Sequence, residues 1–315
     1  MISLDQLRDR AHLLRETLRA CSLCPRACRA DRAAGEHGFC GINGEVILSH
    51  ALPHHGEEPP ISGNRGAGTL FFSFCNLKCI YCQNHQISHG VTGRPCDGET
   101  LADVIIELQK KKCHNIELVT PTPHLPGILE GLTFAVQRGL HIPVVYNCGG
   151  YEDTGVLRQL EGIVDVYLPD FKYGNDEWAL RFSGVGDYVR HALAALREML
   201  RQAGEELLLE DGIARRGLII RHLVLPGAIE NSFDALRLLR KQLPATVPLS
   251  LMSQYTPTPP VAGHPDLGRR ISHEEYAAVV DLALGLGFET LFIQDVDDRH
   301  MTPDFRLEAP FQQLQ

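Results

Sequence analysis

The sequence contains no apolar run long enough to cross a membrane and no long run of basic residues. A membrane-spanning helix needs about 20 consecutive apolar residues, so we expect no membrane segment. The formal net charge of −9 argues against a nucleic acid as the main partner, because binding its phosphates requires a basic face. The N-terminus also lacks a basic segment followed by an apolar one, so we expect no export signal and a cytoplasmic location.

Internal repeats and low-complexity stretches are absent as well. The 315 residues have the composition of an ordinary soluble globular protein, with 44% hydrophobic and 22% charged residues. A chain of this length can form one large domain and a small appendage. Its ten cysteines favour metal binding over disulfides, because thiols stay reduced in the cytoplasm.

Three of these cysteines lie close together in the run Cys75-Asn-Leu-Lys-Cys79-Ile-Tyr-Cys82, directly after an apolar stretch. A fully ligated cubane iron–sulfur cluster takes four thiolates. Three thiolates without a fourth in the same loop predict a cluster with one iron left open, and an open metal position is typical of a catalytic site. The alternatives are three cysteines on an ordinary loop, or a zinc site completed by a distant residue.

Apolar strand candidates alternate with helical patterns along the chain. Residues 4–18 carry one apolar stripe of a short helix, and Ser272 with Glu275 three residues later opens another as a capping box. Continuous apolar strands separated by helices predict a parallel sheet covered on its faces. Six or seven such units are too few for a closed eight-unit barrel. The expected strands span residues 69–74, 116–119, 143–146, 163–168, 218–225, 248–252 and 290–293.

This pattern predicts an α/β fold in two parts. Residues 1–65 form an N-terminal helix and a small cysteine-rich unit, and residues 66–315 form the main domain. A Gly/Pro-rich stretch over residues 56–68 connects the two.

Polar residues and turn formers follow most of the expected strands. In parallel α/β folds the active site lies where the carboxyl ends of strands meet loops, and the three-cysteine run begins at such an end. Each stretch alone is explained as a turn, but their convergence on one rim favours a ligand site, and the glycines allow a ligand to approach the backbone. The stretches are Thr120-Pro-Thr-Pro-His124, Asn147-Cys-Gly149-Gly150, Pro169-Asp170-Phe-Lys172, Arg221-His222 and Gln254-Tyr255-Thr256.

The C-x3-C-x-aromatic-C pattern, with Tyr81 as the aromatic, resembles the cluster loop of the radical S-adenosylmethionine (SAM) enzymes. The longer run from Cys75 to Asn84 resembles the pyruvate formate-lyase activating-enzyme branch. Three further stretches resemble its PflX-like homologues, and the likeness extends from about residue 21 to about residue 256. These stretches are Pro53-His-His-Gly-Glu-Glu-Pro59, Tyr146-Asn-Cys-Gly-Gly-Tyr151 and Leu168-Pro-Asp-Phe-Lys-Tyr173.

The resemblance implies a partial (β/α)6 TIM-type barrel and assigns roles to residues at the strand ends. Asp170 and Lys172 match an Asp-x-Lys element near the SAM carboxylate and an associated cation. Asn147 and Gly150 fall on a third-strand motif on the nucleotide side, next to Gly149. Arg221 matches a fifth-strand arginine near SAM. Tyr81 is expected to pack against the cluster or the adenine rather than to carry a radical.

Two stretches depart from the family pattern. The Gly-Gly-Glu that usually follows the second strand and holds the SAM amino group is replaced by Thr120-Pro-Thr122. On the sixth strand, Ser253-Gln254-Tyr255 stands where activating enzymes tend to show Pro-Tyr-His. The first departure affects the contacts with SAM, and the second also affects the side of the site that faces the substrate.

The chemistry that the resemblance implies uses a [4Fe-4S] cluster and SAM. The amino and carboxylate groups of SAM would complete the open iron, and one electron would break the sulfonium bond. Methionine and a 5′-deoxyadenosyl radical result, and the radical abstracts hydrogen from a substrate. The implied partners are a low-potential electron donor of the flavodoxin or ferredoxin type and an unknown protein or small-molecule substrate.

A second set of cysteines lies near the N-terminus with the spacing C-x2-C-x3-C-x11-C. Four thiolates suit a structural zinc ion and a second [4Fe-4S] cluster equally well. A third alternative is that the thiols are reduced and bind nothing, although so small a segment needs a staple. The set consists of Cys21, Cys24, Cys28 and Cys40.

The segment between this unit and the main domain carries histidines and acids that either line the active site or form a solvated loop. They are His50, His54, His55, Glu57 and Glu58. Three further cysteines are isolated, and we expect them to be buried small apolar residues. They are Cys96, Cys113 and Cys148, of which only Cys148 falls on the expected rim.

Four functions compete on this evidence. The first is a radical SAM enzyme that installs a glycyl radical on a partner protein. The second keeps the same chemistry but modifies a peptide or a small molecule. The third is a non-catalytic iron–sulfur protein for electron transfer or redox sensing, which would need no polar rim. A zinc-dependent nucleic-acid module is disfavoured by the acidic net charge.

Overall fold

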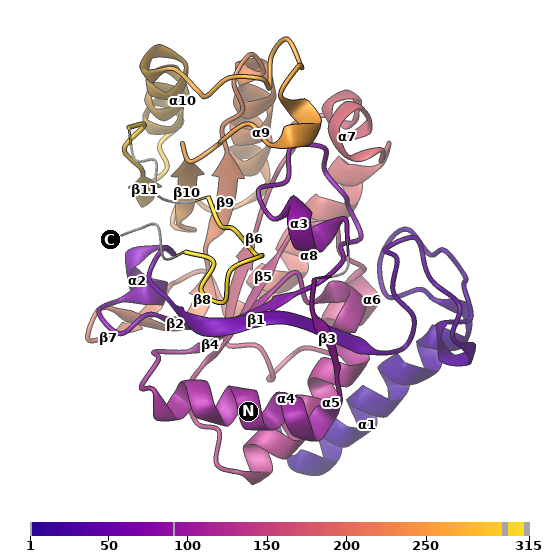
Figure 1. Cartoon of the computed structure of the whole chain (residues 1–315). Coiled ribbons are helices and arrows are strands. Elements are labelled where there is room, and N and C mark those ends of the chain that lie inside the picture. The colour runs from indigo at the N-terminus through magenta and orange to yellow at the C-terminus, as the bar shows by residue number, and fades with distance from the viewer. Residues whose placement is uncertain (1, 91, 298–301, 312–315) are drawn as a thin grey trace.

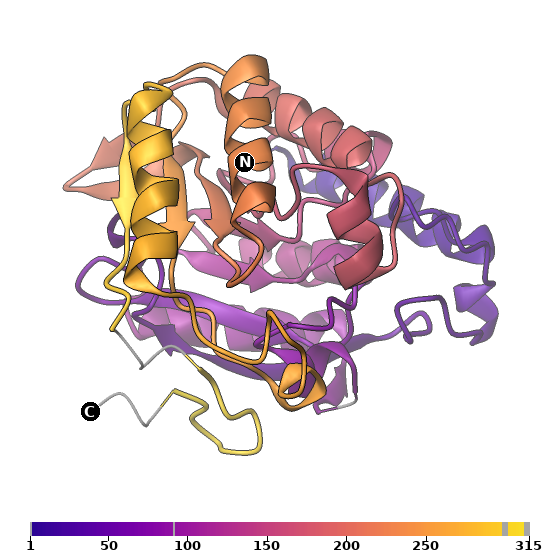
Figure 2. The same ribbon diagram turned by 90° about the horizontal axis from the view of Figure 1, so that it is seen from above.

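The computed structural model describes residues 2–90, 92–297 and 302–311. Its sheet contains a run of parallel strands whose helices lie on the outer side of the curve (Figures 1 and 2). The strands are β1 (Val46–His54), β2 (Ala67–Phe72), β3 (Arg94–Cys96), β4 (Ile116–Val119), β5 (Val144–Cys148), β6 (Val166–Pro169), β7 (Leu208–Glu210), β8 (Ile213–Leu218), β9 (Ile220–Leu223), β10 (Leu249–Met252) and β11 (Leu291–Ile293). The helices of four or more residues are α1 (Leu4–Glu16), α2 (Pro59–Ser62), α3 (His85–Ser88), α4 (Gly98–Lys110), α5 (Leu125–Gln137), α6 (Thr154–Arg158), α7 (Asp176–Ser183), α8 (Tyr188–Ala203), α9 (Ile229–Gln242), α10 (His273–Gly285) and the 3₁₀ helix η1 (Thr17–Ala20).

The strands run in the order β3-β1-β2-β4-β5-β6-β8-β7, and a second sheet has the order β11-β10-β9. Strands β8 and β9 are separated only by Ile219, and a bridge between Asp170 and Arg221 joins the two sheets. The predicted α/β fold with a mostly parallel sheet is confirmed. Over the described part of the chain the sheet is an open, partial barrel and does not close.

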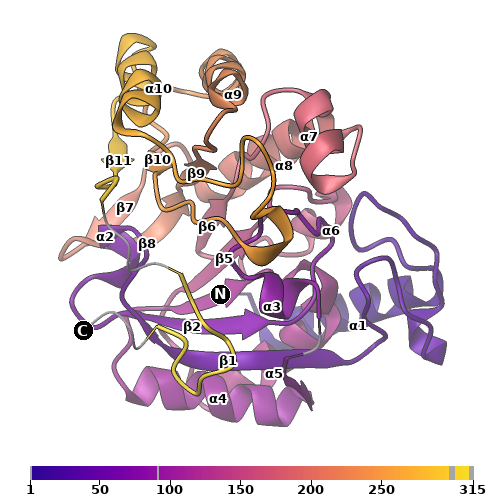
Figure 3. The ribbon, with the colours of Figure 1, turned by 45° about the horizontal axis from the view of Figure 1, so that its top comes forward.

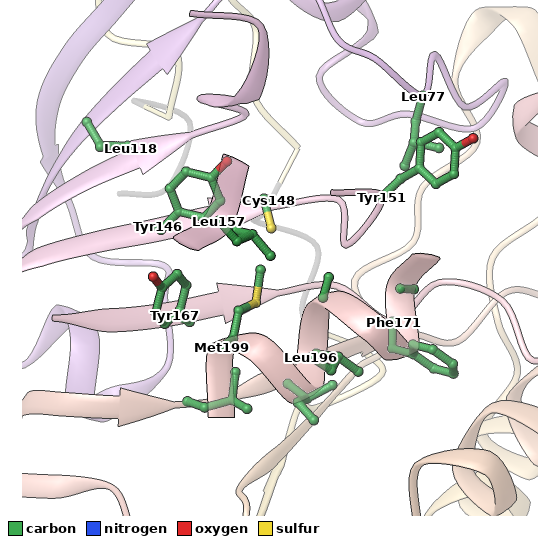
Figure 4. Packing of buried hydrophobic residues seen from close by; sticks show 14 of the residues in the cluster. Leu77, Leu118, Tyr146, Cys148, Tyr151, Leu157, Tyr167, Phe171, Leu196 and Met199 are labelled. Atoms are coloured by element: carbon green, nitrogen blue, oxygen red, sulfur yellow. The ribbon is translucent and has the colours of Figure 1, made fainter. Parts of the chain in front are cut away.

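The two faces of each strand differ because successive side chains point to opposite sides. On β4, Leu118 faces the helices while Glu117 and Val119 face the inside of the curve. The outer layer is the main apolar core, which Figure 4 shows between β5, β6 and α8 with Tyr146, Tyr167 and Met199 in contact. The inner face is therefore free to carry polar residues, and the site lies there.

Two of the predicted helices begin at their expected positions. Helix α1 packs its apolar stripe against α5. At the start of α10, the Ser272 side chain accepts from the Glu275 amide, and the Glu275 side chain accepts from the Ser272 amide, so the predicted capping box is present. Helix α1 leads into the cysteine-rich unit, which protrudes at one edge of the molecule (Figure 3).

Several elements differ from expectation. Strand β1 was not predicted, although it pairs antiparallel with β2 along most of its length. The expected strand over residues 218–225 contains β9 and only the last residue of β8, and β8, which pairs with β6, was not predicted. The stretch over residues 56–68 is more than a connection, since it contains α2 and buries Ile61 inside the barrel. The predicted division between residues 65 and 66 stays a prediction.

The C-terminal segment over residues 302–311 crosses the inner side of β1 and β2 (Figure 1). Phe305 is buried there, with its ring centroid 5.2 Å from that of Phe71. Phe311 lies 4.2 Å from the His54 ring, again between centroids. None of the described helices is both long and apolar enough to cross a membrane.

Candidate functional site

The three-cysteine loop begins immediately after β2, at the carboxyl end of the parallel strands. Two residues of this segment, Phe74 and Lys78, have positive φ angles of 71° and 55°. Non-glycine residues rarely adopt this conformation, and it persists only where the surroundings hold it. Here Arg26 of the cysteine-rich unit holds the loop, because its guanidinium donates to the carbonyl of Asn76 over 3.0 Å and to that of Ser183 at the end of α7, also over 3.0 Å.

Each sulfur in the loop accepts a hydrogen bond. The Leu77 amide donates to Cys75 over 3.4 Å, the Ser183 hydroxyl to Cys79 over 2.9 Å, and the Ser88 hydroxyl to Cys82 over 3.2 Å. Burial raises the pKa of the Cys75 thiol to about 12. Donors aimed at all three sulfurs suit thiolates that bind a metal, because such hydrogen bonds stabilise negative charge on sulfur.

Tyr81, between the second and third cysteines, is a wall of the site. Its ring packs edge-on against Tyr173, Phe182 and Tyr255 at centroid distances of 6.0–6.5 Å. Burial raises the pKa of its hydroxyl well above the ordinary value. A buried aromatic with three such neighbours is positioned by packing.

A cavity opens beside the loop on the inner face of the sheet. The space free of protein atoms, its open mouth included, is about 1170 Å³. Of the residues predicted to bind the first cluster and SAM, all but Gly150 line it. Those that do are Cys75, Cys79, Tyr81, Cys82, Thr120, Asn147, Gly149, Asp170, Lys172 and Arg221.

Asp170 and Lys172 form an ion pair on one wall of the cavity. Burial lowers the pKa of the Lys172 ammonium, but the Asp170 charge outweighs it and raises this pKa above the ordinary value. Lys172 is therefore a fixed positive charge. A zwitterion such as an amino acid could pair with both groups.

Gly149 and Gly150, at the end of β5, lie so close to neighbouring segments that a larger residue would clash with them. A Cβ on Gly150 would lie 2.2 Å from the Asp170 carbonyl oxygen, and its φ is +77°. A Cβ on Gly149 would lie 2.8 Å from Leu77 of the cysteine loop. These glycines therefore let the end of β5 touch both the end of β6 and the loop. Thr120 on the next strand end has φ +58°, an unusual conformation beside the cavity.

Asn147 reaches a buried carboxyl that the sequence did not reveal. Its side-chain amide donates to Glu117 over 2.8 Å, and the Thr69 hydroxyl donates to the same carboxyl over 2.7 Å. Burial, and then the charge of Glu57, raise the pKa of Glu117 to about 8. Glu117 is thus largely protonated at neutral pH.

Arg221 is held by two acids from the segment after β1. Its Nη2 lies 3.0 Å from Glu57 Oε2 and its Nε lies 3.0 Å from Glu58 Oε1. Although burial opposes it, the two carboxylates raise the pKa of Arg221. His54 and Glu57 line the cavity, so for these two residues the active-site interpretation is favoured over a solvated loop. His50 instead contacts the Leu307 carbonyl at 3.0 Å, outside the cavity lining.

The four N-terminal cysteines surround a second, smaller pocket that Asn76 of the three-cysteine loop also lines. Gly38 must stay small there, because a Cβ would lie 3.3 Å from the Cys28 sulfur and 3.5 Å from the Cys40 sulfur. Arg32, only 2% exposed, donates to the Cys21 sulfur over 3.5 Å.

Arg32 has no carboxylate within 4.0 Å among the described residues; its remaining donors reach backbone carbonyls. A buried guanidinium needs a compensating negative charge. The sulfurs are the groups that can supply this charge, and they do so when a bound metal keeps them deprotonated.

Sequence reasoning missed Ser88, Ser183 and Glu117. Ser183 lies 104 positions beyond Cys79, and no spacing rule connects a serine at the end of one helix to a distant cysteine. Glu117 did carry a signal, because an acid inside the apolar run over residues 116–119 is unusual. Cys148 does line the cavity, as its place on the expected rim suggested, while Cys96 and Cys113 are buried elsewhere.

Comparison with known proteins identifies relatives at two levels. Over residues 69–252 the sequence matches the family described as the Radical SAM superfamily. It is similar to uncharacterized protein MJ0674 of Methanocaldococcus jannaschii, with 32% identity over 287 residues that cover 87% of this chain and 77% of that protein. The fold is similar to the crystal structure of a radical SAM methyltransferase from Sphaerobacter thermophilus, with a TM-score of 0.53, 14% identity, and coverage of 99% of this chain and 97% of that one. At that identity the structural likeness shows the fold alone.

Proposed function

The chain belongs to the radical SAM superfamily, and we propose that it cleaves SAM reductively and uses the resulting 5′-deoxyadenosyl radical to abstract hydrogen from a substrate. The observation that carries this proposal is one cavity that the thiols of Cys75, Cys79 and Cys82 share with the polar ends of neighbouring parallel strands. An electron-transfer protein needs no cavity lined by polar strand ends, so the enzyme is favoured over a non-catalytic redox protein.

Cys75, Cys79 and Cys82 would hold a [4Fe-4S] cluster whose fourth iron is open to SAM. When bound, the cluster supplies the electron that breaks the sulfonium bond. The protein contributes a dry, fixed environment: Ser88 and Ser183 donate to the sulfurs. These hydrogen bonds tune the reduction potential of the cluster.

The strand ends would hold SAM itself. Lys172 offers a fixed positive charge for its carboxylate, and Asp170 a negative charge for an ammonium or a cation. Gly149 keeps the backbone open beside the loop. Asn147 presents an amide whose orientation Glu117 fixes by accepting from it. Tyr81 walls off the cluster side by packing.

For the N-terminal cysteines we propose a second [4Fe-4S] cluster rather than zinc. Four sulfurs held 2.3 Å from a zinc ion lie about 3.8 Å from one another. Among the described residues, no three of the N-terminal cysteine sulfurs lie within 4.8 Å of one another. Three potential metal ligands do come that close at His273, Asp295 and Asp297, on the surface. The wider spacing supports a larger centre, whereas Arg32 suits either metal centre, because four thiolates make both of them anionic.

This second centre would lie on the electron's route. Asn76 lines its pocket, and the Asn76 side-chain oxygen is 3.8 Å from the Cys75 sulfur. Cys28 of the N-terminal set is exposed, while Cys79 is buried. A low-potential donor of the flavodoxin or ferredoxin type would therefore reach the N-terminal centre before the buried one.

Activation of a glycyl-radical enzyme stays a prediction of the sequence resemblance. The comparisons match the superfamily and do not support this subtype. Modification of a small molecule or a peptide is the alternative, and Phe311 and His54, whose rings pack 4.2 Å apart between centroids, line the cavity that would hold such a substrate.

An anaerobic assay tests the proposed reaction. Reconstituted protein with dithionite and SAM should form 5′-deoxyadenosine, and Cys79→Ala should form none. Cys96→Ala is the matched control, since Cys96 is buried outside the cavity lining and should leave the product unchanged. No product from an iron-loaded wild type would refute the proposal.

Metal analysis tests the second centre. Two cubane clusters hold about eight iron atoms, and Cys24→Ala should leave about half of the iron and sulfide. Zinc in place of that iron would refute the second cluster without affecting the first.

A further inference from the structure

An unbalanced pair of acids lies at the deep end of the cavity. Glu57 and Glu58 follow β1, whose last residue pairs with the first residue of β2. They therefore lie at the amino ends of the parallel strands, where Glu58 is the N-cap of α2. The three-cysteine loop lies at the opposite, carboxyl end, and Glu57 lines the same cavity as the loop.

One guanidinium faces these two carboxylates. The side chains of Glu57 and Glu58 are 7% and 4% exposed, and Arg221 is 9% exposed. Neither Glu57 Oε2 nor Glu58 Oε2 accepts a directed hydrogen bond from the described residues. The Nε of Arg221 has no directed partner among the described residues either, although it lies 3.0 Å from Glu58 Oε1. One guanidinium therefore faces two carboxylates at ion-pair distance, and Oε2 of each carboxylate keeps acceptor capacity.

The neighbouring groups do not restore neutrality. His54 Nε2 is 3.5 Å from Glu57 Oε1, but burial and then the Arg221 charge lower the pKa of His54 to about 4, so the ring is neutral. Asp170 and Lys172 balance each other. Glu117 contributes no charge when it is protonated and one further negative charge when it is ionised. The deep end therefore carries a net charge of −1 or lower.

An uncompensated buried charge is expensive, by several kcal/mol even after relaxation. Proteins keep such a charge where a bound partner completes it. The Glu57 carboxylate faces the cavity, so its missing partner is a cation that enters this space.

Taking the cavity as the substrate site of the proposed function, we propose that the substrate is an aliphatic amine whose protonated ammonium group binds Glu57. An ammonium group has three donors and no acceptor, which suits carboxylate oxygens with free acceptor capacity. The hydrocarbon part would lie against the apolar wall between Glu57 and the cysteines. That wall consists of Phe71, Val119, Leu223, Met252 and Phe311.

The test compares a cation with its neutral counterpart. Reconstituted full-length protein without SAM is titrated with butylammonium chloride or butanol by calorimetry at constant ionic strength. Butylammonium should bind saturably and butanol should not. Glu57→Gln should weaken butylammonium at least tenfold, while Glu205→Gln, an exposed acid, should not change it.

Stability is the second readout, and it does not depend on the probe. Glu57→Gln removes the excess negative charge and leaves Arg221 paired with Glu58, so the Tm of the ligand-free protein should rise. A fall in Tm would overturn the charge argument. The amine proposal would be refuted by equal binding of both probes, by no saturable butylammonium binding, or by unchanged binding in Glu57→Gln. If the wild type instead binds Mg²⁺ and Glu57→Gln does not, the ligand is an inorganic cation and not an amine.

These outcomes are separate from the proposed reaction. The titration contains no SAM, so failure to form 5′-deoxyadenosine would refute the enzyme while leaving the ammonium site standing. Conversely, if the wild type cleaves SAM but does not bind butylammonium, only the proposal of an amine substrate is refuted.

Discussion

Replacing Glu117 by glutamine should remove a large part of the pH dependence of stability. Glu117 is fully buried on β4 and accepts hydrogen bonds from Thr69 and Asn147. Its pKa is raised from an ordinary 4.5 to about 8, by burial first and the Glu57 charge second. Glutamine keeps the shape and a carbonyl acceptor, but it cannot ionise.

The sign follows from proton binding. Between pH 4.5 and 8 the folded protein keeps the Glu117 proton while the unfolded chain releases it, so the free energy of unfolding falls as pH rises. The contribution is complete below 4.5 and lost above 8. The slope is at most about 1.4 kcal/mol per pH unit, and the whole window is worth at most about 5 kcal/mol. Glu152, whose pKa burial also raises to about 8, adds a similar slope.

Urea unfolding of cluster-free protein between pH 5.5 and 8.5 measures this slope. Glu117→Gln should flatten it by about 1 kcal/mol per pH unit, so the variant gains on the wild type as pH rises. Glu107→Gln is the control, because Glu107 is exposed on α4, and its slope should match the wild type. A slope in Glu117→Gln that equals the wild-type slope would show that Glu117 is ionised throughout and would refute the reasoning.

Three further predictions concern the neighbouring residues. Ser183→Ala removes the hydroxyl that donates to Cys79. The cluster midpoint potential should fall by roughly 20–50 mV in an anaerobic redox titration, which corresponds to a loss of ~0.5–1 kcal/mol per electron. Ser49→Ala is the control, because that hydroxyl contacts His50 outside the cavity lining, and an equal shift there would contradict the assignment. Gly150→Ala should lower the free energy of unfolding by about 2–4 kcal/mol in urea, because the added Cβ meets the Asp170 carbonyl. Gly186→Ala is the control: nothing lies within 4 Å of its Cβ, so the free energy of unfolding should fall by less than about 1 kcal/mol. Arg32→Gln should lower the iron content of the N-terminal centre by about half or more, because the buried positive charge facing Cys21 is lost. Arg19→Gln changes an exposed charge and should leave the iron content unchanged. Full iron loading of both variants would exclude a charge-compensating role for Arg32.

Much of the fold could be predicted because its signals are local. The parallel strands β4, β5 and β6 are continuous apolar runs, and Ser272 with Glu275 marks a helix start within four residues. Strand β1 could not be predicted in the same way. Its sequence, VILSHALPH, mixes histidine and proline with apolar residues, and its pairing with β2 and β3 makes it a strand.

The candidate site divides along the same line. Cys75, Cys79 and Cys82 are recognisable because their spacing within eight residues carries the chemistry. Asp170, Lys172 and Asn147 were expected at strand ends, and the structure brings them to one cavity. Ser183 and Glu117 act on that cavity through contacts that no local pattern encodes.

The sequence by itself determined the alternation of apolar strands and helices, the three-cysteine loop at a strand end, and hence the membership of the superfamily. Only the tertiary structure decided that Glu57 and Glu58 face Arg221 inside the barrel and that serines from two helices donate to the cysteine sulfurs. The physical reason is distance: hydrophobic periodicity and ligand spacing act within a few residues, whereas charge balance and hydrogen bonding depend on which distant segments the sheet brings together.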